Sequence, residues 1–296
     1  MIGFFMRWAH GEKKRGGKKR EALLKQLREK KSGLRKEALE GECTGCGACV
    51  PGCAFLREHG SPKDIFSLAA TDPERLTRLA YLCSLCGLCT ATCRKGADPA
   101  EAFLNIRRNA VESKGVDFAP YRKLLGYESL GVSKAFSWAH LPSECRTLFF
   151  PGCGLSGSRP GKVVAAWRYL QSKDPATGLV LDCCTKPSHD LGRQDAFEAA
   201  FGELHAWCLK MGILKVVVAC PNCFKVFSRY GSGLEVVSIY EVMAGDGSLS
   251  SEPILGEVYL HHPCATRFES AIQDASDVLL ARSAEGLFQN GEKTLC

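Results

Sequence analysis

Eight of the 17 cysteines fall into two short runs with the same spacing, C-x2-C-x2-C-x3-C. The runs are CTGCGACVPGC, with Cys43, Cys46, Cys49 and Cys53, and CSLCGLCTATC, with Cys83, Cys86, Cys89 and Cys93. Three thiolates that are each separated by two residues can surround one face of an iron–sulfur cube. Glycines such as Gly45, Gly47 and Gly87 allow the close backbone turn that this requires.

The fourth cysteine of each run lies too far along the chain to close the same cube easily, and in two-cluster ferredoxins it ligates the other cluster. The predicted ligand sets of two [4Fe–4S] clusters are therefore Cys43, Cys46, Cys49 and Cys93, and Cys83, Cys86, Cys89 and Cys53. A zinc site is the alternative, but four-thiolate zinc sites commonly use two separated C-x2-C pairs. Ala54 and Arg94 follow the runs where bacterial ferredoxins usually have proline, and this change removes no ligand.

A second group of cysteines is spread over the following half of the chain. It comprises Cys153, the adjacent pair Cys183 and Cys184, and the C-x2-C pair Cys220 and Cys223. A cubic cluster has four corners and no use for a fifth thiolate. Two irons ligated from one dipeptide make sense if the cluster is distorted.

The segments around these cysteines alternate between strand and helix patterns. Strands are predicted in RTLFFPGCG, TGLVLDCC, LKVVVACPNC, LEVVSIY and GEVYLHHPC, and helices in DPERLTRLAYL, KVVAAWRYLQS and RQDAFEAAFGELHAWCLKMG. Such alternation favours an α/β domain with a mainly parallel sheet. Because sites in open α/β sheets lie at the carboxyl ends of the strands, we expect the cysteines that follow the strands, Cys264 included, to converge.

The segment from 147 to 223 resembles the cysteine-rich CCG domain of heterodisulfide reductases. The resemblance rests on FFPGCG, LDCCTKPSHDLG and VVVACPNC, which are separated by 29 and 35 residues between their cysteines. It covers residues 41–264 when the two-run segment is included, and the layout is similar to D-type subunits or fused C and B subunits. The resemblance implies a noncubane [4Fe–4S] cluster, with Cys153, Cys183, Cys184, Cys220 and Cys223 as its catalytic ligands. Thr185 replaces the motif's glycine, and a β-branched residue disfavours positive φ there.

These patterns predict an α+β protein with five segments. They are a basic arm (1–40), a small helical two-cluster ferredoxin-like domain (41–110), a connector (111–146), an α/β cysteine-rich domain with a mainly parallel sheet (147–264), and the start of an incomplete second CCG repeat (265–296). The last assignment rests on Cys264 in YLHHPC, which 31 residues separate from Cys296. These two thiols are not expected to form a complete site.

Cysteine usage and charge bear on location and partners. Many cysteines, an odd total, no signal peptide and no apolar stretch of membrane-spanning length predict a reducing, cytoplasmic compartment. Residues 1–40 hold 13 Lys and Arg against 5 Asp and Glu. This arm is interpreted either as a solvated tail or as a docking segment for an acidic partner or an anionic surface at the inner face of the membrane. Aromatic residues do not interleave with its charges, so nucleic-acid binding is not expected.

The remaining candidate residues have plainer interpretations. Cys145 and Cys208 are expected to pack in the interior. His189, His205 and His261 lack the spacing of paired metal ligands.

Two functions fit these features. The first is an oxidoreductase subunit that receives electrons from a flavoprotein or another donor and reduces a disulfide. The alternative is an electron-transfer subunit of a flavin-dependent hydroxy-acid or glycerol-3-phosphate dehydrogenase. The five-cysteine set favours the first, because a relay could use a simpler cluster. No G-x-G-x-x-G motif follows a strand, so flavin would belong to a partner.

Overall fold

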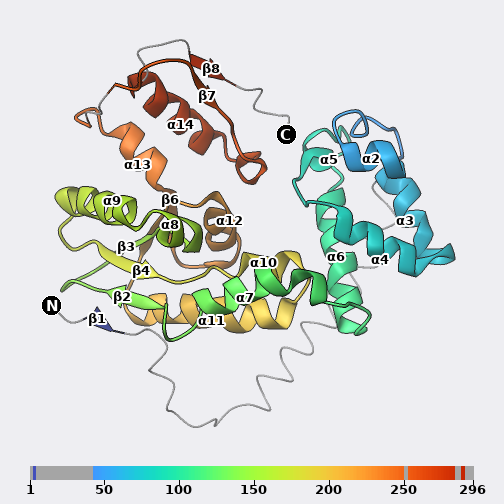
Figure 1. Ribbon diagram of the computed structural model, residues 1–296, viewed down its shortest axis with the longest axis horizontal. Coiled ribbons are helices and arrows are strands. Elements are labelled where there is room, and N and C mark those ends of the chain that lie inside the picture. The colour runs from blue at the N-terminus through green and yellow to red at the C-terminus, as the bar shows by residue number, and fades with distance from the viewer. Residues whose placement is uncertain (1–2, 5–42, 250–252, 284–287, 291–296) are drawn as a thin grey trace, which may run out of the picture.

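A computed structural model of the chain describes residues 3–4, 43–249, 253–283 and 288–290. The described residues form a helical lobe (43–112), a sheet lobe (119–249, with 3–4) and a C-terminal unit (253–283 and 288–290) (Figure 1). Most of the basic arm and the terminal Cys296 lie outside the described residues. The predicted α+β class, with a small helical domain followed by an α/β domain, is confirmed.

The helical lobe consists of short helices that begin at clear capping signals. Its helices are α2 (Ala54–His59), α3 (Pro62–Thr71), α4 (Pro73–Leu82), α5 (Leu88–Ala91) and α6 (Pro99–Glu112). The side chains of Asp72 and Asp98 accept backbone N–H bonds at the starts of α4 and α6, and proline follows each of them. Leu56, Ile65 and Phe103 are buried at the centre of the lobe. The helices therefore pack around one small core from which the cysteine runs emerge.

The sheet lobe is built on a six-stranded sheet within the described residues, in the order β1-β2-β4-β3-β5-β6. Its strands are β1 (Gly3–Phe4), β2 (Trp138–His140), β3 (Thr147–Phe150), β4 (Gly178–Leu181), β5 (Lys215–Val218) and β6 (Glu235–Ser238). The four strands β4, β3, β5 and β6 are parallel to one another. β2 pairs antiparallel with β4, and β1 pairs antiparallel with β2. The chain leaves β3 to one side for β4 and returns to the other side for β5, so the strand order reverses at β3. Ligand sites in open α/β sheets lie at such a reversal point.

Helices cover both faces of this sheet (Figure 1). One face packs on α11 (Gln194–Lys210) and α12 (Pro221–Tyr230) through residues such as Phe201 and Phe227. The other face packs on α9 (Pro160–Lys173) and α13 (Ile239–Gly245) through Val163, Leu170 and Ile239. Burial on both faces explains why β5 is a continuous apolar run.

Three details differ from the expectations drawn from the sequence. The predicted connector contains α7 (Arg122–Gly131), preceded by the 3-10 turn η2 (Ala119–Tyr121), and also β2. Gly3 and Phe4 belong to the sheet rather than to a separate arm. The LEVVSIY strand ends at Ser238, where the serine side chain and Glu241 form a capping box that starts α13.

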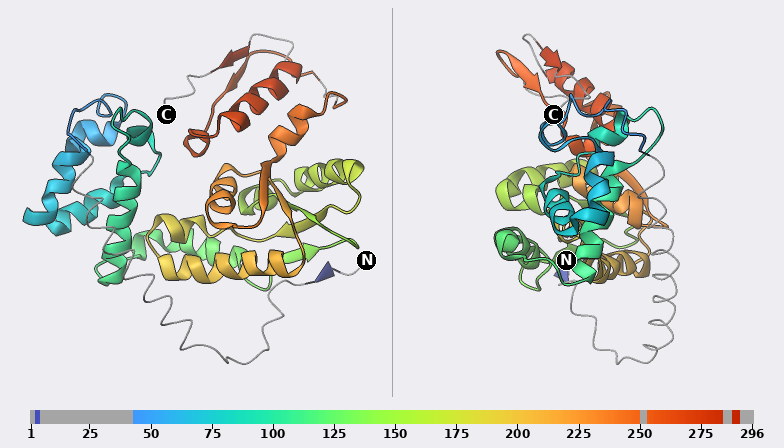
Figure 2. Two further views of the ribbon diagram at one scale, coloured as in Figure 1. Left: turned by 180° about the vertical axis from the view of Figure 1, so that it is seen from behind. Right: turned by 90° about the vertical axis from the view of Figure 1, so that its right-hand side faces the viewer.

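The C-terminal unit is a β–α–β element of its own. It contains β7 (Val258–Leu260), the 3-10 turn η3 (Cys264–Thr266), α14 (Ser270–Ser283) and β8 (Phe288–Asn290), and β7 pairs parallel with β8. Figure 2 shows this unit beyond α13, against which α14 packs. β7 is therefore a strand, as predicted, but it lies outside the main sheet. Its parallel pairing across a helix repeats the arrangement of β3, α9 and β4.

No helix in the described ranges is both long enough and apolar enough to cross a bilayer.

Candidate metal centres

The cysteines of the two runs lie on loops at the ends of the short helices. Cys53 caps the start of α2, Cys83 caps the end of α4, and Cys89 lies in α5. Gly45 and Gly87 have φ of 75° and 74°, which is the left-handed conformation that the tight turn requires. Leu85 stands at the position that corresponds to Gly45 and also has a positive φ of 54°. The second run therefore forms the same kind of turn without the glycine.

Cys49 lies near one cysteine of the other run. Burial raises the pKa of Cys49, and the negative charges of Cys43, Cys46 and Cys93 raise it further. Such effects fall with distance, so these three thiols lie near Cys49. Cys43, Cys46 and Cys49 come from the first run, whereas Cys93 ends the second.

The second group consists of Cys83, Cys86 and Cys89 from the second run and Cys53, which ends the first run. Burial raises the pKa of Cys83, Arg107 opposes this shift, and Cys86 and Cys53 add to it. The pKa of Cys89 is raised to about 12 by burial and by the charges of Cys83, Cys49 and Cys86. The spacing predicts these two groups of four, and Cys49 of the first group also acts on Cys89 of the second. Their assignment as ligands remains a prediction.

The five later cysteines meet at the carboxyl edge of the parallel strands. Cys153 begins α8 (Cys153–Ser158) after β3, the pair at 183 and 184 follows β4, and Cys220 caps α12 after β5. The Sγ atoms of Cys153 and Cys183 lie 4.0 Å apart. Cys184 contacts both Cys183 and Cys223, and Cys223 contacts Cys220. The strand ends thus bring the whole set into one continuous cluster.

The thiols of this cluster differ in their pKa values. Hydrogen bonds from Cys183 and Cys223 lower the pKa of Cys184 to about 5, and a bond from Cys223 lowers the pKa of Cys220 to about 6. The pKa of Cys183 is raised to about 12, although its bond with Cys153 lowers it, because its contact with Cys184 and burial outweigh that bond. Since thiolates are the metal-binding form, the set carries ready donors in a buried position.

A glycine makes room for this cluster. Gly152 has φ of 83°, and a Cβ there would lie 3.0 Å from the Sγ of Cys223 and from the Cβ of Cys220. A side chain at this position would therefore displace two of the five cysteines. The buried thiols and the small residue beside them fit a sulfur-ligated metal group, and the sequence signal for this feature is the PGC segment.

Thr185 adopts the conformation that its β-branched side chain disfavours. Its φ is 54° and its ψ is 28°, so the expectation that threonine would resist positive φ is wrong here. The Thr185 N–H donates to the Sγ of Cys183 at 3.4 Å, and its hydroxyl donates to the carbonyl of Cys184 at 2.8 Å. These bonds hold the residue in place. Strained residues of this kind cluster at functional sites.

The other cysteines and histidines lie outside both centres. Cys145 and Cys208 are buried in the sheet-lobe core. Cys264 lies in η3 of the C-terminal unit, which packs against α12, and its convergence with the other strand-end cysteines remains a prediction. His189 contacts Asp190 and Tyr230. The ring of His205 contacts the carbonyl of Ser232, and His261 is exposed.

Sites for a single metal ion and for a four-iron cluster place their ligands differently. In the described part of the chain, no three His, Cys, Asp or Glu side chains are arranged to hold one ion. Zinc needs four ligands at about 2.0–2.3 Å, whereas the thiolates of a four-iron cluster bind different irons.

Comparison with known proteins agrees with the first centre. Residues 42–98 match the family model of the 4Fe-4S dicluster domain. A ferredoxin-type dicluster domain is therefore found in this chain. No curated protein and no solved structure matches the sequence. The domain supports iron–sulfur clusters and iron–sulfur electron transfer as the chemistry of the helical lobe.

The dicluster domain docks on the loop that follows the adjacent cysteine pair. The Tyr81 hydroxyl donates to the Leu191 carbonyl at 2.9 Å, and Arg229 pairs with Glu101 at 3.0 Å. A Cβ on Gly192 would lie 2.6 Å from the backbone of Arg107. The sequence pattern did not single out these residues, because their roles depend on how the two lobes pack.

A cleft of about 430 Å³ lies between the second cysteine run and the sheet lobe. Its walls include Leu85 of the dicluster domain, Lys186 of α10 (Lys186–Asp190), Lys225 of α12 and Phe268 of the C-terminal unit. The charge of Lys186 also acts on Cys220. The cleft therefore lies beside the second cysteine run and near Cys220 of the five-cysteine set.

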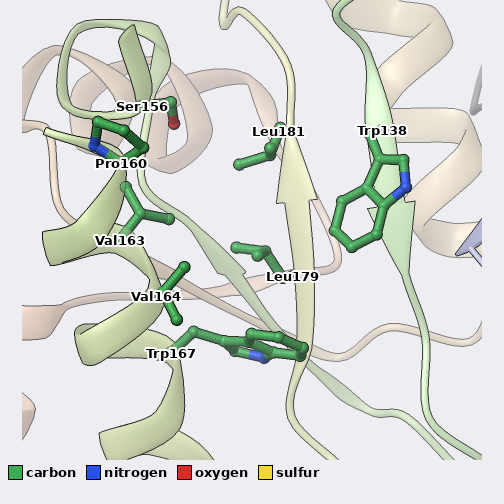
Figure 3. A pocket seen from close by; sticks show the side chains of 8 residues that line it. All are labelled: Trp138, Ser156, Pro160, Val163, Val164, Trp167, Leu179 and Leu181. Carbon is green, nitrogen blue, oxygen red and sulfur yellow. The ribbon is translucent and has the colours of Figure 1, made fainter. Parts of the chain in front are cut away.

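A second hollow, of about 360 Å³, lies on the sheet near β2 and α9 (Figure 3). Its lining includes Trp138, Val164 and Trp167, and it has no charged side chain. Its one hydroxyl, that of Ser156, donates to the Gly152 carbonyl, and with no cysteine and no charge in its lining the hollow does not extend the redox centres.

Proposed function

We propose that this chain is a heterodisulfide reductase-like iron–sulfur oxidoreductase subunit that passes electrons from the dicluster domain to the five-cysteine set and reduces a disulfide. The observation that carries the proposal is the convergence of five cysteines from three strands. The adjacent pair is central to this set, since Cys184 contacts both Cys183 and Cys223. Five donors exceed what one cube needs.

The donor sets have separate roles in this proposal. Cys43, Cys46, Cys49 and Cys93 would hold one [4Fe–4S] cluster, and Cys83, Cys86, Cys89 and Cys53 the other. Cys153, Cys183, Cys184, Cys220 and Cys223 would hold a noncubane [4Fe–4S] cluster. When bound, the clusters supply one-electron transfer and, at the last set, an iron site for sulfur.

The reaction consumes two electrons and two protons for each disulfide, and it yields two thiols. The electrons come from a partner subunit, a flavoprotein or another donor. The chain's own residues hold the thiolate donors away from bulk water and keep positive charge beside them. Lys186 acts on Cys220, and the Tyr127 hydroxyl donates to the carbonyl of Cys153 at 3.0 Å. Tyr127 and Tyr240 also lie near the thiolates.

Docking of the lobes supports transfer between them. The bonds of Tyr81 and Arg107 join the end of α4, where Cys83 lies, to the C-terminal end of α10, the helix that follows Cys184. A relay to the disulfide site needs the second cluster to stand next to that helix. The cleft that Lys186 lines gives a small disulfide an approach to the same region.

Anaerobic iron and sulfide analysis, combined with EPR during titration with a thiol, tests the proposal. About twelve irons per chain are expected, four for each cluster, together with a signal that responds to thiol. About eight irons and no thiol-sensitive signal would favour the alternative, an electron-transfer subunit of a flavin-dependent hydroxy-acid or glycerol-3-phosphate dehydrogenase. Stoichiometric zinc would contradict both functions.

A further inference from the structure

Arg107 is a buried cation at the junction of the two lobes. It lies in α6 with 6% of its surface exposed. Its Nε donates to the Ala80 carbonyl at 2.9 Å and its Nη1 to the Asp190 carbonyl at 2.6 Å, while Nη2 donates to the carbonyl of Cys83. One guanidinium therefore ties α4, the second cysteine run and the C-terminal end of α10 together.

No carboxylate forms an ion pair with Arg107 among the described residues. The carboxylate of Asp190 is engaged by Lys186 at 2.5 Å and by His189 at 2.8 Å. The Cys83 thiol and the Asp190 carboxylate both lie near Arg107, and the Cys83 carbonyl accepts a hydrogen bond from its Nη2. A buried cation is unfavourable unless negative charge lies near it, and Arg107 shares the Asp190 carboxylate with Lys186 and His189. The thiolate ligands around Cys83 would supply further negative charge.

Within the described part of the chain, the cations beside the first ligand group, Arg94 and Lys63, are exposed. Arg94 acts on Cys46, but Arg94 is exposed and Cys46 lies at the surface. Solvent and salt screen a charge in that position far more than one that is buried. The two centres therefore differ in their electrostatic surroundings although their cysteine spacing is identical.

We propose that Arg107 is the counter-charge of the Cys83 ligand group and makes its cluster easier to reduce than the cluster of the Cys43 group. Reduction adds negative charge, and a buried cation stabilises the added charge more than an exposed one. Net charge, hydrogen bonding and solvent exposure all set cluster potentials. The inference rests on the cluster assignments of the proposed function and adds a direction to them. The more easily reduced cluster is the one of the Cys83 group. Arg107 joins Cys83 to Asp190 of the sheet lobe, so this cluster lies at the junction of the two lobes.

A redox titration of the full chain, loaded with iron and sulfide and followed by EPR, tests this inference. The signal of the second cluster is identified first, as the one that Cys86→Ser changes. In the wild-type chain this signal should have the higher potential. Arg107→Gln should reduce its reduction equilibrium constant at least tenfold, which is about 59 mV for one electron. Arg107→Lys, which keeps the charge, should restore most of the difference.

Arg108→Gln is the matched control. Arg108 neighbours Arg107 on α6 and is equally buried, at 5% exposed, but it pairs with Glu101 at 2.9 Å. Its neutral variant should leave the second signal at the wild-type potential. An equal shift in Arg108→Gln, or a shift of the first signal instead, would overturn the inference.

If Arg107→Gln takes up no iron, the redox titration of the wild-type chain still tests the inference by itself. A second-cluster signal with the lower potential contradicts the role of Arg107 while leaving the clusters themselves in place. A lysine variant that shifts as far as glutamine also contradicts it, because charge would then not be the cause. Absence of iron–sulfur signals from the wild-type chain would overturn the proposed function instead.

Discussion

The two cysteine systems of this protein are assembled in opposite ways. In the dicluster domain, three of each group of four thiols come from seven consecutive residues, and short helices hold the loops. In the sheet lobe, the five thiols come from segments up to 70 residues apart and meet only because β3, β4 and β5 are parallel neighbours. The first arrangement depends mostly on local chain geometry, and the second depends on the whole fold. The two systems should therefore respond differently to substitution.

The largest expected effect separates the two systems outright. Cys184→Ser removes the thiol that contacts Cys183 and Cys223. It should lose about four irons per chain and all disulfide reduction, while both ferredoxin-type EPR signals remain. Iron analysis and EPR on the same sample measure both outcomes.

Cys208→Ser is the control for this experiment. Cys208 is 1% exposed in the core and lies on α11, outside both cysteine systems. Burial of a hydroxyl there should cost about 1–3 kcal/mol of stability without loss of iron. If Cys184→Ser abolishes all three signals together, the two systems do not form independently.

The next test concerns the crossed assignment, in which the fourth cysteine of each run ligates the cluster of the other run. Cys93→Ser should change the same EPR signal as Cys43→Ser, because both thiols act on Cys49. Cys53→Ser should instead change the signal that Cys83→Ser changes. Each variant is expected to lose or convert one cluster of the two. If Cys53→Ser matches Cys43→Ser, each run holds its own cluster and the crossed assignment is wrong.

A smaller effect is expected where the two systems meet. Gly192→Ala puts a Cβ within 2.6 Å of the Arg107 backbone and does so at a φ of 78°. Overpacking of this kind costs about 1–3 kcal/mol, so chemical unfolding should show a loss of that order and limited proteolysis should cut more readily between the lobes. Gly126→Ala on α7 meets nothing within 4 Å and should stabilise by about 0.5–1 kcal/mol. Equal effects of the two substitutions would mean that Gly192 does not mediate docking.

The sequence predicted those parts of the structure that repeated spacings or periodic patterns of residues encode. Its alternation of apolar and helical segments predicted β3, β4, β5 and β6, and the cysteines that follow the first three of these strands, because each signal lies within a few residues. Arg107 was not predicted, since its partner Asp190 lies 83 residues away and nothing local marks the pairing. β2 was missed for a similar reason: three residues, Trp138–His140, form a strand because a neighbouring strand pairs with them.

Thr185 is the residue for which the sequence pointed the wrong way, and it yields the smallest predicted effect. A left-handed conformation costs a non-glycine residue about 1–2 kcal/mol, and the hydroxyl bond to the Cys184 carbonyl returns about 0.5–1.5 kcal/mol. Thr185→Gly removes both the strain and the bond, so unfolding free energy should stay within about 1 kcal/mol of the wild type. Thr185→Val keeps the β-branch and loses only the bond, so it should be less stable than Thr185→Gly. Urea unfolding of the three apo chains makes the comparison. A valine variant as stable as the wild type would show that the hydroxyl does not hold this loop, and the conformation would then have to come from the packing of Cys183 and Cys184 alone.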